Sequence, residues 1–381
     1  MKERFNSLYR SDARVYRAPG RVNLIGEHTD YNEGFVMPAA IDLYTRVAIA
    51  PRGDRAIHAH SENFSETVEF DLDDPDPRAT GHWGDYVRGV AVTIDRAGHR
   101  LRGANLLIRG EIPAGAGLSS SASLEVAVGY ALMKNSGLEV DPSELAKLAQ
   151  RAENEFVGAR CGIMDQFIVT HGEPGRALLL DCRSLDHRSA PIPDHARLVI
   201  CNTMVKHEIA RGEYNTRRAE CEEGVRYLSR KLPGITALRD VTQADLNRYG
   251  DHLPRVVYKR CRHVITENAR VIAAAAALSE GDLMEFGRLM YKSHLSLRED
   301  YEVSSPELDT MVRLAGQADG VYGARMTGGG FGGCTINIVK ADKVDDFKRV
   351  IATGYERATG IAPDIYSSTA VGGVEEIDAA E

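Results

Sequence analysis

The sequence predicts an α+β protein of two domains. The chain has 381 residues, a length that suits two domains. Its strand-like and helix-like segments alternate, but without the regular β–α–β rhythm of a doubly wound parallel sheet. Hydrophobic residues make up 43% of the chain and charged residues 27%, as is typical of a soluble protein with a large core. The polar segment 184–194, which contains two prolines, predicts a boundary between domains of residues 1–190 and 191–381.

Short apolar runs predict the strands. Residues 46–50, 104–111, 177–180 and 198–201 form such runs. Residues 334–339 alternate polar and apolar side chains, which predicts a strand with one solvated face. Residues 71–80 are rich in Asp and Pro and predict a loop.

Capping signals and helical spacing predict the helices. Asp141, Pro142 and Glu144 form a helix start with a capping box. The apolar face that follows is made of Leu145, Leu148, Ala149, Ala152 and Phe156. Further helices are expected within residues 124–132, 206–231 and 271–278.

Charge and composition exclude several classes of protein. The net charge is −8 and no long basic run occurs, which argues against a nucleic-acid partner. No segment reaches the ~18 apolar residues of a membrane span, and the N-terminus does not resemble a signal peptide. The six cysteines lack the spacing of zinc or redox sites, so reduced thiols in a cytoplasmic protein are expected.

A serine- and glycine-rich loop at residues 113–123 is the strongest functional signal. It lies between a predicted strand and a predicted helix, where glycines allow close approach and the helix N-terminus favours an anion. It is not a Walker loop, and Ser120 replaces the third glycine of a dinucleotide fingerprint. Taken alone, a phosphate site and a flexible turn are about equally good interpretations.

Residues 18–32 concentrate polar side chains between Gly20 and Gly26 and just beyond. Carboxylates there can accept hydrogen bonds from sugar hydroxyls, while Arg21 and His28 can donate them. The adjacent spacing of Glu27 and His28 does not match a helical or finger metal site. A solvated loop is the alternative interpretation.

Two further segments carry candidate residues. Asp165 lies in an apolar setting, and it is either a structural cap or ion pair or a general base with Arg21 as its partner. Residues 328–333 match G-x-G-x-x-G, but a strand follows them rather than a helix, which excludes the dinucleotide interpretation. Their glycines still indicate a close backbone approach.

Together these segments resemble the galactokinase family, within the superfamily of galactokinase, homoserine kinase, mevalonate kinase and phosphomevalonate kinase (GHMP). Residues 20–32 resemble the galactokinase signature, residues 115–123 the phosphate loop and residues 328–333 the third glycine motif. The resemblance implies an active site in the cleft between two α+β domains. It also implies ATP-dependent phosphorylation of the anomeric hydroxyl of α-D-galactose. Apart from the resemblance, we expect a monomer whose partners are small molecules only.

The resemblance also assigns residues by motif position. The implied sugar pocket consists of Arg21, Glu27, His28, Asp30, Gly162, Asp165 and Tyr214. The implied ATP site consists of Gly115, Ala116, Gly117, Leu118, Ser119, Ser120 and Ser121, with Trp83 near the adenine. The implied Mg²⁺ ligands are Ser120 or Ser121 together with Glu153. Asp165 would orient the hydroxyl and accept its proton late, and Arg21 would face the transferring phosphoryl charge.

Two other functions remain open at this point. One is a kinase for a related sugar, such as N-acetylgalactosamine, L-arabinose or a uronic acid. The other is a sugar- and ATP-binding sensor without catalysis, which the presence of both Arg21 and Asp165 disfavours. A protein kinase is excluded, because the strand lysine and the His-Arg-Asp loop are missing.

Overall fold

The N-terminal half is built on a six-stranded sheet. The computed structural model describes residues 1–206 and 210–377. In spatial order, this sheet consists of β13 (Glu375–Ile377), β1 (Arg14–Asn23), β3 (Pro38–Pro51), β6 (Ala104–Gly110), β4 (Ala56–Ser61) and β5 (Glu66–Asp71). β4 runs parallel to β6, and the other neighbours are antiparallel. The predicted strands at 46–50 and 104–111 are confirmed.

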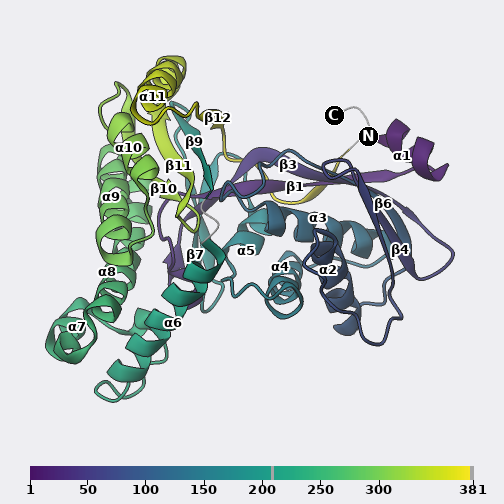
Figure 1. The fold of residues 1–381 in the computed structure, drawn as a ribbon, viewed down its shortest axis with the longest axis horizontal. Helices are drawn as coiled ribbons and strands as arrows, with labels where there is room; N and C mark the ends of the chain where they lie inside the picture. The colour runs from purple at the N-terminus through teal and green to yellow at the C-terminus, as the bar shows by residue number, and fades with distance from the viewer. Residues whose placement is uncertain (207–209, 378–381) are drawn as a thin grey trace.

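Helices cover one face of this sheet (Figure 1). They are α2 (Gly84–Arg96), α3 (Ser120–Asn135), α4 (Pro142–Arg151) and α5 (Met164–His171). Because side chains alternate along a strand, Tyr16 and Val47 pack beneath these helices while Val15 and Ala48 point the other way. That second face packs against Phe5 of α1 (Lys2–Tyr9).

The C-terminal half contains an antiparallel four-stranded sheet. Its spatial order is β10 (Val321–Thr327), β11 (Gly332–Lys340), β9 (Ala196–Lys206) and β12 (Asp364–Ser368). One face packs against α8 (Arg255–Ser279) and α9 (Leu283–Ser296), and the other against α10 (Pro306–Ala315) and α11 (Val344–Thr359). The mixture of helices with largely antiparallel sheets confirms the predicted α+β class.

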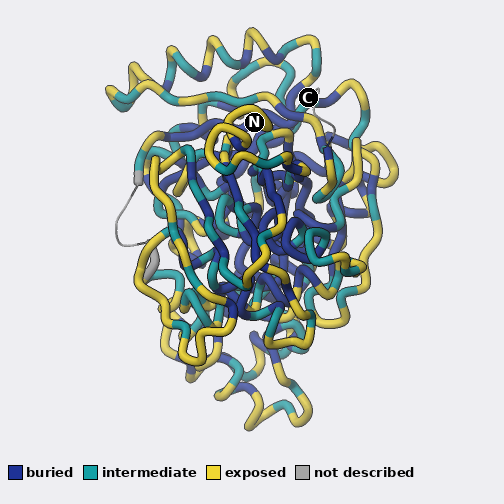
Figure 2. The backbone as a smooth tube through the Cα atoms, turned by 90° about the vertical axis from the view of Figure 1, so that its right-hand side faces the viewer, coloured by how far each residue is buried: buried dark blue, intermediate teal, exposed yellow. Residues whose placement is uncertain are grey.

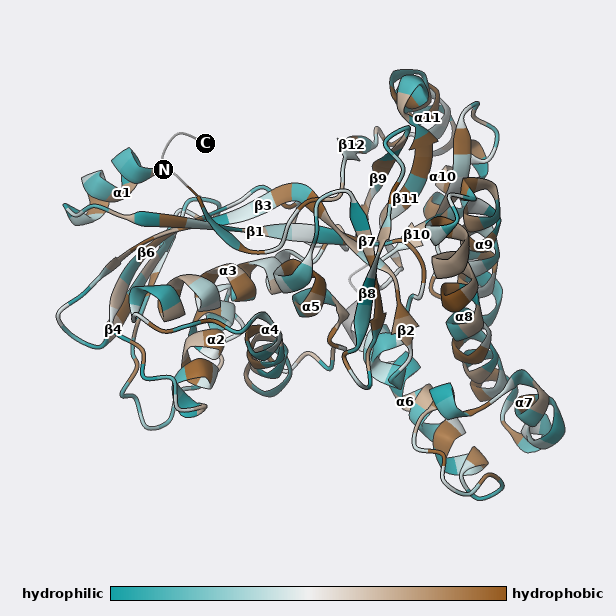
Figure 3. Ribbon diagram, turned by 180° about the vertical axis from the view of Figure 1, so that it is seen from behind, coloured by the Kyte–Doolittle hydropathy of each residue, from teal (hydrophilic) through white to brown (hydrophobic). Residues whose placement is uncertain are grey.

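Burial along β11 corrects one prediction. The alternation at residues 334–339 led us to expect one solvated face, but every residue of that segment is buried. Helices cover both sides of the strand, and Thr335 and Asn337 form hydrogen bonds inside the core. Figure 3 shows hydrophobic residues recurring along β11 and α8, whereas α1 is largely hydrophilic.

A small sheet occupies the predicted boundary region. It consists of β2 (Phe35–Val36), β7 (Arg176–Asp181) and β8 (His187–Pro191). β8 lies within the polar segment 184–194 and pairs with β7, so this segment is an ordered strand and not a free linker. The division at residue 190 stays a prediction, and β13 from the C-terminal half joins the N-terminal sheet.

Further helices and short 3-10 turns belong to the described fold. The helices are α6 (Ala210–Leu228) and α7 (Gln243–Tyr249), and the 3-10 turns are η1 (Asp30–Asn32), η3 (Leu238–Asp240), η4 (Gly250–His252) and η6 (Ala341–Lys343). The helix predicted over 206–231 is therefore shorter than expected, since Lys206 ends β9 and residues 207–209 lie outside the described part. The helix predicted over 271–278 is confirmed as part of α8.

The capped helix after Asp141 is confirmed at its start but changes geometry at its end. The Asp141 side chain accepts the backbone N–H of Glu144, as predicted. The predicted capping box is not formed, because the Glu144 carboxylate lies 2.9 Å from His99 Nε2 and pairs with that ring. After Arg151 the helix widens into the π-helical turn η2 (Ala152–Val157), and a second such turn, η5 (Leu297–Tyr301), follows α9. Single π turns are frequent at functional sites, and η2 carries Glu153.

The described helices include none that is both long and apolar enough to cross a membrane. Buried backbone fills the centre of the molecule in Figure 2, with exposed segments at its periphery. All six cysteines are free thiols, and four of them are buried.

Candidate active site

A polar cavity of about 220 Å³ brings the predicted sugar residues together. We call it the polar cavity. All seven residues expected there line it, namely Arg21, Glu27, His28, Asp30, Gly162, Asp165 and Tyr214. Four lining residues were not assigned to it from the sequence, namely Cys161, Met164, Gly328 and Gly329.

Arg21 and Asp165 form a bidentate ion pair at one wall of this cavity. Arg21 Nε and Nη2 each donate to an Asp165 carboxylate oxygen at 2.7 Å. Arg21 Nη1 donates to the carbonyl of Gly117, and the Ser119 hydroxyl donates to Asp165. Asp165 lies in the first turn of α5, where the helix dipole favours a negative charge. The predicted pairing is confirmed, and it connects β1, α5 and the serine-rich loop.

Asp30 and Gly162 are in tight contact at another wall. A Cβ atom at position 162 would lie only 2.0 Å from Asp30 Oδ2, so only glycine fits there. Burial, followed by the neighbouring Asp165 carboxylate, raises the pKa of Asp30 to about 7.

His28 presents a neutral imidazole to the cavity. Burial lowers the pKa of His28 to about 3, so the ring is uncharged at neutral pH. Nδ1 lies 2.8 Å from the Tyr31 hydroxyl, while the buried Nε2 has no hydrogen-bond partner among the described residues. A buried polar atom without a partner is costly, and a ligand hydroxyl would satisfy it.

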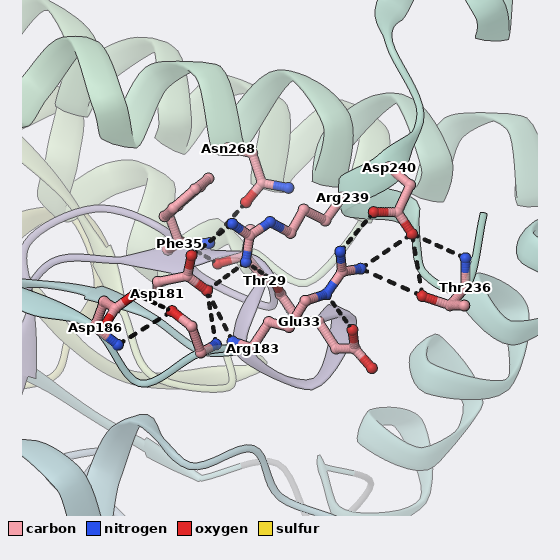
Figure 4. Close-up of polar contacts among 11 residues, drawn as sticks. Thr29, Glu33, Phe35, Asp181, Arg183, Asp186, Thr236, Arg239, Asp240 and Asn268 are labelled. Carbon is pink, nitrogen blue, oxygen red and sulfur yellow. Dashed lines mark hydrogen bonds and ion pairs between the residues drawn. The ribbon is translucent and has the colours of Figure 1, made fainter. Parts of the chain in front are cut away.

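Reciprocal ion pairs hold the segment that follows Asp30 (Figure 4). Arg183, just after β7, donates to the two carboxylate oxygens of Asp240 at 2.7 and 3.0 Å. The neighbouring Arg239 donates in return to both oxygens of Asp181. Both arginines also bind Glu33, Arg183 at the carboxylate and Arg239 at the backbone carbonyl. The loop that carries Asp30 is thereby fixed against η3 of the helical region.

Residues of α8 hold the same loop from the other side. The backbone N–H of Gly26 donates to Glu267 Oε1 and that of Phe35 to Asn268 Oδ1, each at 2.9 Å. The loop is therefore anchored at both of its ends.

Arg160, which had no structural interpretation from the sequence, connects the segment before Gly162 to helix α6. The Nη2 atom of Arg160 donates to Glu222 Oε1 of α6 at 2.7 Å. Arg218 of the same helix donates to the backbone carbonyl of Arg160 at 2.8 Å. These contacts tie the Gly162 loop to the helix that carries Tyr214.

A larger cavity of about 600 Å³ opens beside the serine-rich loop. We call it the Trp83 cavity. Gly115, Ser120 and Ser121 line it, and Trp83 stacks there on Phe64 with centroids 5.7 Å apart and an interplanar angle of 13°. Phe64 had no recognisable signal in the sequence.

The rest of the serine-rich loop faces away from the Trp83 cavity. Ala116, Gly117, Leu118 and Ser119 do not line it. Ala116 and Leu118 are buried, and the carbonyls of Gly117 and Leu118 accept hydrogen bonds from Arg21. This part of the loop therefore contacts Arg21, which lines the polar cavity.

A third cavity, of about 380 Å³, lies between the other two. It shares Tyr86 and Val157 with the Trp83 cavity and Cys161 and Tyr214 with the polar cavity. The polar cavity and the Trp83 cavity are therefore connected through this third cavity, along residues 157–161 and Tyr214.

Two buried carboxylates, those of Glu153 and Glu125, share one hydrogen-bond donor. Gln166 Nε2 donates to Glu153 at 2.6 Å and to Glu125 at 3.4 Å. Burial, followed by the nearby Asp165 charge, raises the pKa of Glu153, and a hydrogen bond with Ser121 partly offsets the rise. Burial also raises the pKa of Glu125 well above its usual range.

The third glycine motif contacts the serine-rich loop. A Cβ at Gly328 would lie 2.8 Å from the Gly117 carbonyl oxygen, and one at Gly333 would lie 2.9 Å from that of Ala116. The backbone N–H of Gly328 donates to Glu27. As expected, these glycines allow a close backbone approach, which here is to the serine-rich loop and to the Glu27 carboxylate.

Comparison with known proteins gives three family matches. Residues 3–51 match the galactokinase galactose-binding signature, residues 85–173 the GHMP kinases N terminal domain and residues 274–357 the GHMP kinases C terminal domain. The fold also resembles a crystal structure of mevalonate kinase, with a TM-score of 0.66 and 20% identity over 93% of this chain and 98% of that one. Fold and site thus define a member of the GHMP kinases.

Full-length relatives narrow this class. Galactokinase of Chloroflexus aggregans is 51% identical, with 97% of this chain and 94% of that protein covered, and galactokinase of Mannheimia succiniciproducens is 44% identical, with 98% and 96% covered. The crystal structure of Lactococcus lactis galactokinase complexed with galactose has a TM-score of 0.95 and 38% identity, with 99% and 98% covered. The chain belongs to the galactokinase family and is an enzyme of the ATP-using kinase type.

Proposed function

We propose that this enzyme transfers the γ-phosphoryl group of ATP to the anomeric hydroxyl of α-D-galactose, releasing α-D-galactose 1-phosphate and ADP. One observation carries the proposal. The seven residues predicted to bind the sugar line one cavity, and its Arg21–Asp165 pair contacts the loop predicted to bind phosphate.

In this proposal the polar cavity binds galactose. Glu27 and Asp30 accept hydrogen bonds from ring hydroxyls, and the unpartnered Nε2 of His28 completes the set. Tyr214 packs its ring near His28 and Tyr31, with centroids 5.6 and 5.1 Å away, and closes the cavity from α6.

The Trp83 cavity receives ATP. The adenine lies by Trp83 and Phe64, and the phosphates extend past Gly115 to the N-terminus of α3, whose free N–H groups favour an anion. The loop contains no lysine, so backbone N–H groups and a cation meet the phosphate charge.

Ser120, Ser121 and Glu153 fit Mg²⁺. They offer hard oxygen ligands, and a cation would stabilise the buried Glu153 carboxylate. Mg²⁺ usually takes one or two protein carboxylates together with phosphate oxygens and water, so these side chains would supply part of its coordination. When bound, Mg²⁺ would offset charge on the transferring phosphates.

Asp165 and Arg21 perform the chemical step. The anomeric oxygen attacks the γ-phosphorus, the bond to the bridging oxygen of ADP breaks, and Asp165 accepts the hydroxyl proton. Because the transition state is loose, the proton can leave late, so Asp165 mainly orients the hydroxyl. Arg21 keeps Asp165 in place and faces the charge on the phosphoryl group.

ADP release in the presence of ATP and Mg²⁺ tests the function. The panel contains D-galactose, N-acetylgalactosamine, L-arabinose, D-glucose and D-galacturonate. Strong turnover of galactose with little of glucose supports the proposal, whereas no turnover of any sugar by folded, ATP-binding protein contradicts it. Size-exclusion chromatography of the same sample tests the predicted monomer.

Asp165→Asn tests the base. We expect kcat to fall by about 10²–10⁴-fold while the protein remains folded, as is usual when a positioned base is lost. A kcat like that of the wild type would remove this role from Asp165.

A further inference from the structure

A fully buried arginine lies directly behind the polar cavity. Arg325 of β10 has no exposed surface and does not line the cavity. Its Nη1 lies 3.8 Å from Glu27 Oε1 and donates to the carbonyl of Asn23 at 3.0 Å. Arg325 therefore lies beside a side chain proposed to bind the sugar, but outside the lining of the cavity.

The other nitrogens of Arg325 are not satisfied. Nε and Nη2 are buried and have no hydrogen-bond partner among the described residues. Burying a cation with unpaired N–H groups is costly, so its charge must be compensated by an interaction in the core. Among the described residues, the carboxylate within ion-pair distance of Arg325 is that of Glu27.

The buried Glu27 carboxylate is stabilised in its ionised form by the charge of Arg325. Only 3% of its side chain is exposed, and the nearby Arg21 is already held by the bidentate pair with Asp165. Burial raises the pKa of Glu27, and the charges of Arg325 first and Arg21 second oppose that rise. Asp30, in the same cavity but without such a cation of its own, has a pKa of about 7.

Hydrogen bonds fix the geometry around this carboxylate. Asn23 Nδ2 and the backbone N–H of Gly328 donate to its two oxygens. The Thr327 hydroxyl lies 3.0 Å from the Asn23 N–H, so the ends of β1 and β10 are joined around Glu27. Because both oxygens accept hydrogen bonds, these donors favour the ionised form of Glu27.

Other charged or titratable groups surround Glu27 from each neighbouring element. They are Arg21 of β1, Arg325 of β10, Asp165 of α5, His263 and Glu267 of α8, and His28 and Asp30 of its own loop. Glu267 has its own cation in Arg270, which binds it at 2.6 Å, and burial lowers the pKa of His263 to about 4. Arg325 is therefore the cation available to Glu27.

We propose that Arg325 is a positioning residue that keeps Glu27 ionised and aimed into the cavity, and that it thereby sets the affinity of the enzyme for galactose. This inference rests on the proposed function. It links the third glycine motif to recognition of the sugar, although that motif is about 300 residues from Glu27 in the sequence.

The test compares Arg325→Met, Arg325→Lys, Glu27→Gln and the double variant Glu27→Gln/Arg325→Met. Galactose binding is measured by calorimetry without ATP between pH 5.5 and 8.5, together with KM for both substrates. We expect Arg325→Met to weaken galactose binding at least tenfold at pH 6.5 and to regain affinity as the pH rises, because Glu27 then ionises without help. The wild type and Arg325→Lys share the titration of Asp30, whose pKa is about 7, so the ratio of their affinities should change little over this range. Only Arg325→Met should show an additional dependence on pH, and KM for ATP should stay constant in all variants.

The double variant separates this role from simple packing. If Arg325 acts through Glu27, adding Arg325→Met to Glu27→Gln should cause no further loss of galactose affinity. Additive losses would overturn the proposal, and so would an Arg325→Met affinity that equals that of the wild type or falls short of it by the same factor at every pH.

Thermal unfolding keeps the test informative if Arg325→Met folds poorly or if the wild type phosphorylates no sugar. Removing both charges should give a higher Tm than removing Arg325 alone, since no buried carboxylate is left without its cation. A double variant less stable than Arg325→Met would contradict the pairing itself, whereas failure of catalysis with intact coupling would contradict only the proposed function.

Discussion

Gly162 is the position where a single methyl group should have the largest calculable effect on sugar binding. In Gly162→Ala the new Cβ would lie 2.0 Å from Asp30 Oδ2 and 2.3 Å from its Cγ, whereas ordinary contact begins at 3.4 Å. The two groups must therefore separate by about 1.4 Å, and a displacement of about 1 Å at a reacting centre can cost about 10²-fold in rate. Asp30 is the group that must move, because the clash involves its whole carboxylate.

We expect Gly162→Ala to lower kcat/KM for galactose by about 10²-fold. KM for ATP should stay unchanged, because Gly162 does not line the Trp83 cavity. The assay is ADP release with each substrate varied in turn.

Gly212→Ala is the matched control. Gly212 lies on α6 two residues before Tyr214, and no atom lies within 4 Å of its would-be Cβ. Its kinetics should therefore resemble those of the wild type. A Gly162→Ala enzyme with kcat/KM within about twofold of the wild type would refute the assignment of Asp30 to the sugar.

Three further outcomes are expected. Burial, and then Asp165, raise the pKa of Asp30 to about 7. Between about pH 4 and pH 7 the folded state therefore keeps a proton on Asp30 that the unfolded state has released. The contribution of Asp30 to stability is lost as the pH rises through 7. Asp30→Asn should accordingly raise the Tm of the ligand-free enzyme more at pH 8 than at pH 5; an equal effect at both would count against a raised pKa. Trp83→Ala should weaken ATP binding about tenfold in calorimetry by removing the stacking surface, with galactose binding unchanged as the control. Glu153→Gln should raise the Mg²⁺ concentration needed for half-maximal MgATP binding at least about tenfold, and an unaltered Mg²⁺ titration would exclude Glu153 as a ligand.

Local chemistry explains which parts of the structure could be predicted from the sequence. The Asp141 cap works through residues only three positions apart, and the strands at 46–50 and 198–201 follow from short apolar runs. Motif resemblance supplied the candidates of the polar cavity, and the structure brings all seven together. Their catalytic and binding roles stay predictions until the variants are measured.

The remaining features depend on contacts between distant segments. The polar residues of β11 look solvated in the sequence, because nothing local reveals that α10 and α11 cover them. Phe64 lies in no motif and reaches the Trp83 cavity only through the pairing of β4 with β5. Arg325 lies in none of the segments interpreted from the sequence, and only its distance to Glu27 reveals a connection to the site.

The place of β13 beside β1 has a consequence for biosynthesis. Arg14 of β1 forms an ion pair with Glu376 of β13, 362 residues further along the chain. While the chain is being made, β1 emerges first, and its outer edge has no partner until β13 follows. An open strand edge can pair with another chain, so a nascent or truncated polypeptide is exposed to self-association until this edge is covered. The N-terminal sheet is therefore complete only after residue 377 has been made.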